Sequence, residues 1–371
     1  MKSILSVGMD VHKNSFSLCA YDGYTGEIVS ESTFASDVKL VIKFIETLKS
    51  RYESDVEIKC GYEAGCLGYS LYKSLTSRGV DCVILAPTTM QVSAKNKMVK
   101  NDRMDALNIA KNLASGSYKA VYVPDEEDVE IKEYIRMIHD FKKELKRVKQ
   151  EIYAFVLRHG YQYDGKSKWT IRYMNWIREL EMSEIQRETL NEYIAEMENL
   201  NDKINRFMNR IDEMYQSERY HEKVSKLRCF KGIETFAAMT IQVETADFER
   251  FPSAKAYASY TGLTTGEHSS GDKNNRIGIT KQGNTVIRKT LVECAQSLVK
   301  GNVYAKKSQG LKSRQKGMDV NIIAYADKAT ERLKKKYQKL IERNVPRNKA
   351  IVAVARELAC FIWGMETGNI H

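Results

Sequence analysis

The sequence predicts an α/β amino-terminal domain, then long helices, then a basic and mainly helical carboxy-terminal region. In the first third, short apolar runs alternate with segments of helical spacing. From Val129 onward, apolar residues recur at steps of three or four. The formal charge is −3 over residues 1–130, +1 over 131–250 and +13 over 251–371. We therefore place domain boundaries at 1–125, 126–222 and 223–371 of the 371 residues.

The first third contains three extended segments before its first helix. Further along, two more extended segments are separated and followed by helical ones, and Pro87 ends the last strand. The expected elements, in order, are strands over Ile4–Met9, Phe16–Tyr21 and Glu27–Phe34, a helix over Val38–Leu48, a strand over Val56–Tyr62, a helix over Leu67–Leu75, a strand over Val80–Leu85 and a helix over about 102–113. This order predicts a mixed sheet flanked by helices.

Two long apolar stripes follow the first domain, the first from Ile131 to Phe155 and the second from Leu190 to Met214. A polar break and a short segment with Trp169 and Trp176 separate them. Such spacing is typical of an antiparallel helical hairpin or of a coiled coil between subunits. An ordinary helical bundle within one chain fits as well.

The carboxy-terminal third is helical apart from one loop. Pro252 is expected to begin a helix that runs to Tyr260, and the last helix is expected over Ile351–Met365. Between these helices, residues 262–284 (GLTTGEHSSGDKNNRIGITKQGN) contain five glycines and few apolar residues. So polar a loop is usually functional or disordered.

The net charge of +11 favours polyanionic partners such as nucleic acids, although a solvated lysine surface accounts for it equally well. The seven cysteines form no CxxC pair and the six histidines form no HExxH or HxxxH motif, so zinc chemistry has no support. The first residues lack a signal-peptide pattern, and no segment has the roughly 18 apolar residues of a membrane span. We expect a soluble, cytoplasmic, nucleoid-associated protein with reduced core thiols and no membrane partner.

Four acidic residues of the first third stand at informative places. Asp10 ends the first strand, Glu63 ends the fourth, and Asp102 and Asp105 share one face of the last helix because they are three residues apart. Each alone is commonly a turn or cap residue, with Asp102 and Asp105 as an N-cap and a first-turn acid. His12 and Lys13 beside Asp10 are most simply a solvent-facing turn, although they could tune a site there.

Together these acids predict a metal site. Asp10 lies in an apolar run, where a carboxylate is costly unless it is paired or metal-bound, and converging carboxylates repel unless divalent cations neutralise them. The element order is that of an RNase H-like domain, in which such acids come from the first strand, the fourth strand and the last helix. Asp10, Glu63, Asp102 and Asp105 would hold two Mg²⁺ ions, the usual arrangement for phosphodiester transfer.

At these motifs the chain resembles a known family. VGMDVHK, GYEAG and KNDRMDALNIA resemble the DEDD, RuvC-like domain of the insertion-sequence "one-ten" transposases and the related Piv-type DNA invertases. The stretch from FERFPSAKAYASYTGL through NTVIRKTLVECA is similar to the second conserved domain of that family, as is the helix VAVARELACFIWGM. The resemblance covers residues 4 to about 115 and about 225 to 300.

The resemblance implies a DNA recombinase that cuts and rejoins strands with a serine nucleophile, assisted by the DEDD metal site across a subunit interface. The best match for the nucleophile is Ser270, with Ser269 as its neighbour. The resemblance also implies a bridge RNA that pairs with donor and target DNA, and a coiled coil over the middle helices that makes a homodimer or tetramer. From the residues themselves, Lys273, Arg276, Lys281 and Arg288 are expected to hold nucleic acid phosphates.

Three alternatives stay open on the sequence. A RuvC-like nuclease or junction resolvase would use the same acids without a serine intermediate. A sugar-kinase or actin-like ATPase would require glycine and hydroxyl residues directly after Asp10, where Val11, His12 and Lys13 stand. A non-catalytic DNA-bridging protein would tolerate loss of the acids.

Overall fold

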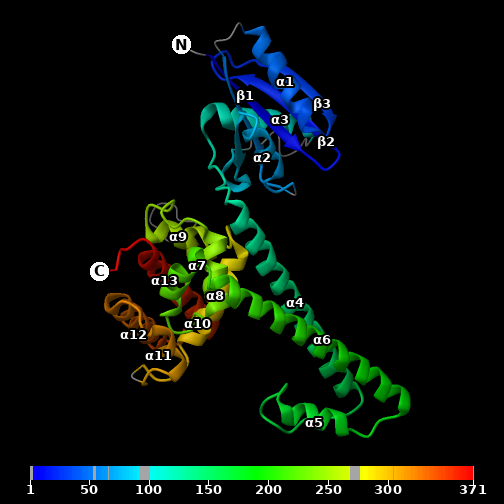
Figure 1. The fold of residues 1–371 in the computed structure, drawn as a ribbon, viewed down its shortest axis with the longest axis vertical. Coiled ribbons are helices and arrows are strands. Elements are labelled where there is room, and N and C mark those ends of the chain that lie inside the picture. The colour runs from blue at the N-terminus through cyan, green and yellow to red at the C-terminus, as the bar shows by residue number, and fades with distance from the viewer. Residues whose placement is uncertain are drawn as a thin grey trace. The chain divides into compact units, whose positions relative to one another are not determined.

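The computed structural model describes residues 3–52, 56–65, 67–91, 101–267, 276–303 and 305–370. The chain forms two compact units, Met1–Pro124 and Asp125–His371 (Figure 1). Within the described ranges, no helix combines the length and the apolar character needed to cross a membrane.

The first unit is built on a five-stranded mixed sheet in the order β3-β2-β1-β4-β5. The strands β1, β2 and β3 are antiparallel neighbours, whereas β1, β4 and β5 run parallel. The predicted mixed sheet is therefore confirmed. The elements of this unit are β1 (Ser3–Val11), β2 (Ser15–Asp22), β3 (Ile28–Ala35), α1 (Val38–Arg51), β4 (Val56–Glu63), α2 (Ser70–Thr76), β5 (Asp81–Leu85), the short 3-10 helix η1 (Pro87–Thr89) and α3 (Asp102–Ser115).

Helices cover both faces of this sheet. Because strand side chains alternate between faces, Leu5, Val7 and Met9 of β1 point to one side, where they share a core with Val41 and Ile45 of α1. The other side packs against α3. The helix α2 begins at Ser70, three residues later than expected, because Gly68 has a left-handed φ of 56° that a helix does not allow.

The second unit begins with two long antiparallel helices, α4 (Glu126–Arg158) and α6 (Glu184–Tyr215), joined by a segment that contains α5 (Ile171–Glu179). Their predicted apolar stripes face each other, since the Phe141 and Phe207 rings lie 5.3 Å apart and the Phe155 and Tyr193 rings 6.2 Å apart. We call α4, α5 and α6 the arm. The helical hairpin is thus formed within one chain, and a coiled coil between subunits stays a prediction.

The remaining helices and two short strands form the body of the second unit. The prediction of a mainly helical carboxy-terminal region is therefore confirmed. Its elements are α7 (Glu218–Arg228), α8 (Thr235–Thr245), α9 (Ala254–Tyr260), β6 (Thr265–Glu267), β7 (Arg276–Ile279), α10 (Thr285–Leu298), α11 (Gln309–Gln315), α12 (Val320–Glu342) and α13 (Arg347–Glu366). The helix α9 begins two residues after Pro252 because Ser253 caps it, accepting from the Ala256 amide.

One apolar core unites the body with the near end of the arm. Ile131, Ile135 and Ile138 of α4 and Ile211 of α6 are buried together with the central residues of α8, α10 and α13. The predicted boundary between residues 222 and 223 stays a prediction.

Candidate metal centre

The strand β1 and the helix α3 approach each other so closely that Gly8 leaves no room for a side chain. A Cβ at Gly8 would lie 2.2 Å from the Ala106 carbonyl oxygen and 2.3 Å from the Ala110 amide nitrogen. Asp10 follows Gly8 by two residues and so faces the same side of the sheet. Asp102 lies one helical turn before Ala106. The close contact therefore brings the end of β1 next to the first turn of α3.

Asp10, His12 and Asp102 gather at this point. The His12 Nε2 atom lies 3.2 Å from Oδ2 of Asp10 and 3.8 Å from Oδ1 of Asp102. One ligand atom from each of the three residues lies within 4.8 Å of the others. The Asp10 side chain is 17% exposed, against 55% for both His12 and Asp102. The cluster therefore has one sheltered carboxylate and two ligands that solvent reaches.

The electrostatics of Asp10 disfavour its charged form. Burial is the main cause of the raised pKa of Asp10, which His12 opposes and to which the negative charges of Asp102 and Asp105 add. Its Oδ2 atom is shielded from solvent and has no hydrogen bond among the described residues, although His12 lies at ion-pair distance. A cation at this atom would neutralise the carboxylate and satisfy the oxygen.

The two acids of α3 are not needed to cap the helix. The N-cap is Asn101, whose side chain accepts a hydrogen bond from the Met104 amide. The capping interpretation of Asp102 is therefore wrong, and both Asp102 and Asp105 lie in the first turn. Asp105 is close enough to influence Asp10 electrostatically, although it is not one of the three clustered ligands.

Glu63 stands beside Asp10 on the neighbouring parallel strand. The pairing of β1 with β4 ends at Met9 and Tyr62, and Asp10 and Glu63 follow this last pair. A Cβ at Gly61 would touch Leu113 of α3, so Glu63, two residues later, faces the α3 side as well. Glu63 is exposed, and its carboxylate is outside the group of ligands within 4.8 Å.

The donor set suits a divalent cation. Carboxylate oxygens are the ligands that Mg²⁺ and Mn²⁺ prefer, and an imidazole nitrogen is compatible with Mn²⁺. The shielded Oδ2 of Asp10, with the His12 imidazole and a second carboxylate close by, is a fitting place for such an ion. Asp10 and Asp102 would hold it, and the two-ion arrangement with Glu63 and Asp105 stays a prediction.

Sequence reasoning favoured a solvent-facing turn for His12 and left open that it tunes a site at Asp10. His12 does lie in an exposed turn, and its Nε2 is nevertheless close to both Asp10 and Asp102. The cause is the tight β1–β2 connection, in which the His12 amide donates to the Ser15 carbonyl at 2.9 Å. No strand-spacing rule signals this position, because His12 lies beyond the end of β1 at Val11.

The second predicted site is the polar loop of the second unit. Ser269, Ser270 and Lys273 lie outside the described residues, as does the side chain of Arg276. Their roles stay predictions. The described parts of the loop form a short antiparallel pair of strands, β6 and β7.

Backbone hydrogen bonds close the base of this hairpin. The Lys281 amide donates to the Gly262 carbonyl at 3.2 Å, and the Asn284 amide donates to the Tyr260 carbonyl at 3.1 Å. At Gly283, with a φ of 103°, a Cβ would lie 2.0 Å from the Tyr260 carbonyl oxygen. Glycine is therefore required for the two chain segments to meet here.

The two other cations predicted to hold phosphates differ in their surroundings. Arg288 donates from Nη1 to the Thr261 carbonyl at 3.1 Å, so it supports the base of the hairpin. Lys281 is exposed, with a left-handed φ of 56°.

A buried ionic centre lies beside the base of the hairpin, and sequence reasoning missed it. The fully buried side chain of Glu244 accepts from Arg136 at 2.7 and 3.1 Å and from Asn284 at 2.7 Å, and Lys132 lies 3.4 Å away. These cations and the amide lower the pKa of Glu244, outweighing the burial that raises it. Glu244 thus ties α4 of the arm to the residue that ends the hairpin.

Comparisons with known proteins agree with both motif sets. Residues 224–309 match the family model described as "Transposase IS116/IS110/IS902 family". Residues 7–160 match a model of the DEDD transposase type of IS110, described as "Transposase".

Similar proteins span most of the chain. A "Putative transposase y4qE" of Sinorhizobium fredii is 31% identical over 366 residues, which cover 97% of this chain and 87% of the relative. The "Transposase for insertion sequence element IS1533" of Leptospira borgpetersenii is 31% identical over 345 residues, covering 92% of this chain and 97% of the relative. The "Transposase for insertion sequence element IS1111A" of Coxiella burnetii is 23% identical over 336 residues, 88% of each chain.

Proposed function

Because this chain belongs to the IS110/IS116/IS902 family of insertion-sequence transposases, we propose that it cuts and rejoins DNA with a serine nucleophile and a DEDD metal site. The family establishes DNA transposition as the activity. The serine mechanism, the identity of the metal and the participation of an RNA are the parts that we propose. The observation that carries the metal site of the proposal is the sheltered Asp10 carboxylate, grouped with His12 and Asp102.

We propose that the first unit has an RNase H-like fold. The sheet order β3-β2-β1-β4-β5, with three antiparallel strands followed by two parallel ones, supports this assignment. In that arrangement the carboxyl ends of β1 and β4 lie side by side, next to the first turn of the last helix. The acids that the motifs single out stand at these three places.

Asp10 and Asp102 are the proposed ligands of a first divalent cation, and Glu63 and Asp105 are the proposed additional ligands for a second. When bound, such ions lower the barrier to phosphodiester transfer by stabilising charge on the reacting oxygens. The chain itself positions the ligands through the contact of Gly8 with α3. The Nε2 atom of His12 lies 3.2 Å from Oδ2 of Asp10, within hydrogen-bond distance beside this site.

Ser270 is the proposed nucleophile, with Ser269 as the alternative. Its oxygen would form a bond to phosphorus while the bond from phosphorus to a bridging ribose oxygen breaks. The serine proton leaves with a base, and the departing oxygen takes up a proton. Attack by a second DNA hydroxyl then releases the serine, so the joined product has as many phosphodiester bonds as the substrate.

Lys281 supports this proposal as an exposed cation near the end of the hairpin, suited to hold a phosphate. Lys273 and Arg276 are proposed to do the same, and Arg288 to hold the hairpin base in place. We further propose that a bridge RNA selects donor and target sites, and that the arm contributes to a homodimer or tetramer.

The test is a strand-cleavage and covalent-adduct assay with the purified protein, its flanking RNA, donor and target DNA, and Mg²⁺. A protein–DNA adduct on denaturing gels that is lost in Ser270→Ala and in Asp10→Ala supports the full proposal. An adduct that persists in Ser270→Ala but is lost in Ser269→Ala moves the nucleophile by one residue. Cleavage without an adduct, unaffected by both serine variants, would leave a RuvC-like nuclease.

A further inference from the structure

A cavity of about 350 Å³ on the arm is lined by four lysines and no acidic residue. Its lining is Lys142, Leu145, Lys146, Lys149, Gln150, Tyr153, Lys168 and Trp169, and we call it the lysine groove. We propose that the lysine groove binds the phosphodiester backbone of an unpaired nucleic acid strand. The proposal does not depend on the serine or on the metal site.

The two faces of α4 carry opposite kinds of charge. Residues 142, 146, 149 and 153 share one face by helical periodicity, and they are three lysines and a tyrosine. The opposite face carries Asp140, Glu144, Arg147 and Glu151. There Arg147 pairs with Glu144 and Glu151, and Asp140 pairs with Lys143. Ion pairs therefore neutralise charge on one face. Among the described residues the lysines of the other face form no ion pair, although Glu293 influences Lys142 electrostatically.

Three of the four lysines of the groove contact aromatic rings, and Lys142 also lies 3.8 Å from the Met208 sulfur and is influenced by Glu293. The Lys168 Nζ lies 3.4 Å from the centre of the Tyr153 ring, and the Lys149 Nζ lies 5.6 Å from the centre of the Trp169 ring. Lys146 is exposed, and within the described part of the chain it has no ion-pair partner. Lys142 lies at one end, with its Nζ 3.6 Å from the centre of the Phe236 ring. Ammonium groups of this kind attract phosphates.

The backbone at Trp169 is unusual in a way that favours a binding role. Its φ of 65° is in the left-handed region, which is unfavourable for a bulky side chain. The conformation holds the indole next to Lys149 and edge-on to Tyr173, with ring centres 5.2 Å apart. Proteins that bind single strands combine a basic groove with aromatic rings, because the unpaired bases can stack on the rings.

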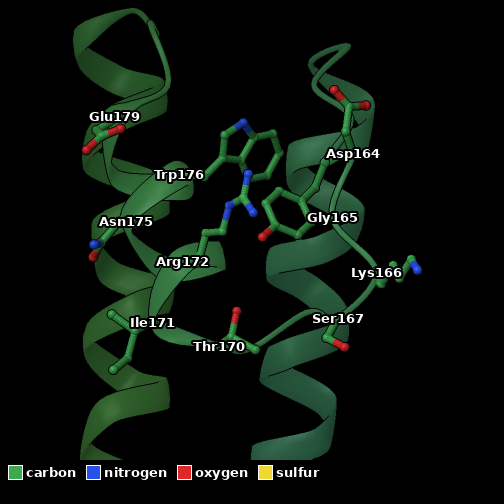
Figure 2. A pocket seen from close by; sticks show the side chains of 11 residues that line it. Asp164, Gly165, Lys166, Ser167, Thr170, Ile171, Arg172, Asn175, Trp176 and Glu179 are labelled. Atoms are coloured by element: carbon green, nitrogen blue, oxygen red, sulfur yellow. The ribbon is translucent and has the colours of Figure 1, made fainter.

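A larger cavity at the end of the arm does not offer this chemistry. It measures about 1140 Å³ and is lined by Asp164 and Glu179 as well as by Lys166 and Arg172. Figure 2 labels both carboxylates, Asp164 and Glu179, and the cationic Arg172 among the side chains that line it. With both signs of charge present, this cavity has no preference for an anion. The lysine groove does prefer an anion, because every charged residue that lines it is a lysine.

The experiment measures binding of labelled oligonucleotides to the full chain by fluorescence anisotropy, without metal, over a series of salt concentrations. The key variant is Lys146→Ala with Lys149→Ala. Its matched control, Lys143→Ala with Arg147→Ala, removes the same charge from the paired face of the same helix. Single-stranded DNA, single-stranded RNA and duplex DNA of one sequence are compared.

We expect the groove variant to bind both single strands about tenfold more weakly. The slope of log K against log salt should fall by about 0.7 for each lysine that no longer neutralises a phosphate. The control and a Lys146→Arg, Lys149→Arg variant should bind like the wild type. Thermal unfolding of each variant verifies that the arm stays folded. A weakening confined to duplex DNA, or an equal weakening in the control, would overturn the proposal.

Two further measurements distinguish nucleic acid binding at the groove from a subunit interface and from the proposed catalytic mechanism. If the groove variant binds every oligonucleotide normally but changes its oligomeric state in sedimentation, the groove is an interface between subunits and the proposal fails. The Asp10→Ala variant should keep groove binding while losing cleavage. Failure of the proposed catalytic mechanism and failure of the groove are therefore seen in different assays.

Discussion

Asn284 donates a hydrogen bond from Nδ2 to Oε2 of the buried Glu244 at 2.7 Å, across 40 residues of sequence. The same asparagine caps α10, because its Oδ1 accepts from the Val286 and Ile287 amides. Its own amide closes the base of the hairpin on Tyr260. One side chain thus connects the arm, through Glu244, to the loop in which the nucleophile is predicted.

Replacing Glu244 should destabilise the second unit. Glu244→Gln leaves Lys132 and Arg136 without their carboxylate, and removing one partner of a buried ion pair typically costs about 3 to 5 kcal/mol. Because water reaches the half-exposed Arg136, we expect the lower end of this range. Urea unfolding should show a loss of about 3 kcal/mol in the free energy of unfolding. Glu213→Gln, which breaks the exposed pair with Arg210, is the control and should cost below about 1 kcal/mol. Equal effects of the two substitutions would contradict the role of Glu244.

Gly8→Ala should push α3 away from the sheet. The new Cβ would meet backbone atoms of Ala106 and Ala110, which cannot rotate away as a side chain can. We expect destabilisation of about 1 to 3 kcal/mol, together with weaker metal binding, because Asp10 and Asp102 depend on this close approach. Calorimetric unfolding and Mn²⁺ titration measure the two effects. Gly310→Ala, where the nearest atom is 3.8 Å away on a flexible arginine, should be tolerated.

Metal should stabilise the first unit through Asp10. A ligand at a hundred times its dissociation constant adds about 2.7 kcal/mol to the free energy of unfolding, so Mg²⁺ or Mn²⁺ should raise the melting temperature of the wild type. Asp10→Asn should abolish the gain. Without metal the variant should be the more stable protein at neutral pH, because burial and the charges of Asp102 and Asp105 raise the pKa of Asp10 and disfavour its charged form in the fold. A metal-induced gain of similar size in both proteins would place the ion elsewhere.

Local patterns were sufficient to predict the sheet of the first unit, and they singled out Asp10 as an unusual residue in it. The alternation of β1 predicts Leu5, Val7 and Met9 on one face, and the structure places them in one core. Asp10 stood out because a carboxylate interrupts an apolar run. Local patterns could not show which residue caps α3, because Asn101 and Asp102 are both common cap residues. The structure assigns the cap to Asn101.

Interactions between distant residues could not be predicted from the sequence. The partners of Glu244 are 108 residues before it in α4 and 40 residues after it at α10, and no spacing rule links such positions. The position of the His12 ring depends on a turn geometry that one residue type does not specify. The lysines of the groove were counted in the net charge. Only the structure shows that acidic residues pair with cations on the opposite face of α4, whereas these lysines form no ion pair among the described residues.

Glu366, at the end of α13, should make stability depend on pH. Burial raises the pKa of Glu366 from its usual 4.5 to about 7, with Lys226 and Lys223 opposing, and its Oε1 has no hydrogen bond within the described residues. Because the folded pKa is above the unfolded one, the folded protein stays protonated where the unfolded chain ionises. Stability should therefore fall as the pH rises from about 4.5 to about 7 and then level off.

Glu366→Gln tests this titration. The variant keeps the shape of the protonated acid without its charge, so it should match the wild type below about pH 4.5 and exceed it above about pH 7. The difference should be on the order of 2 kcal/mol, since each unit of pKa shift corresponds to about 1.4 kcal/mol and the side chain is only partly enclosed. Urea unfolding at a series of pH values gives both curves, with Glu342→Gln on the exposed end of α12 as the control. Parallel curves for the wild type and Glu366→Gln would show that Glu366 ionises in the fold as readily as in the unfolded chain.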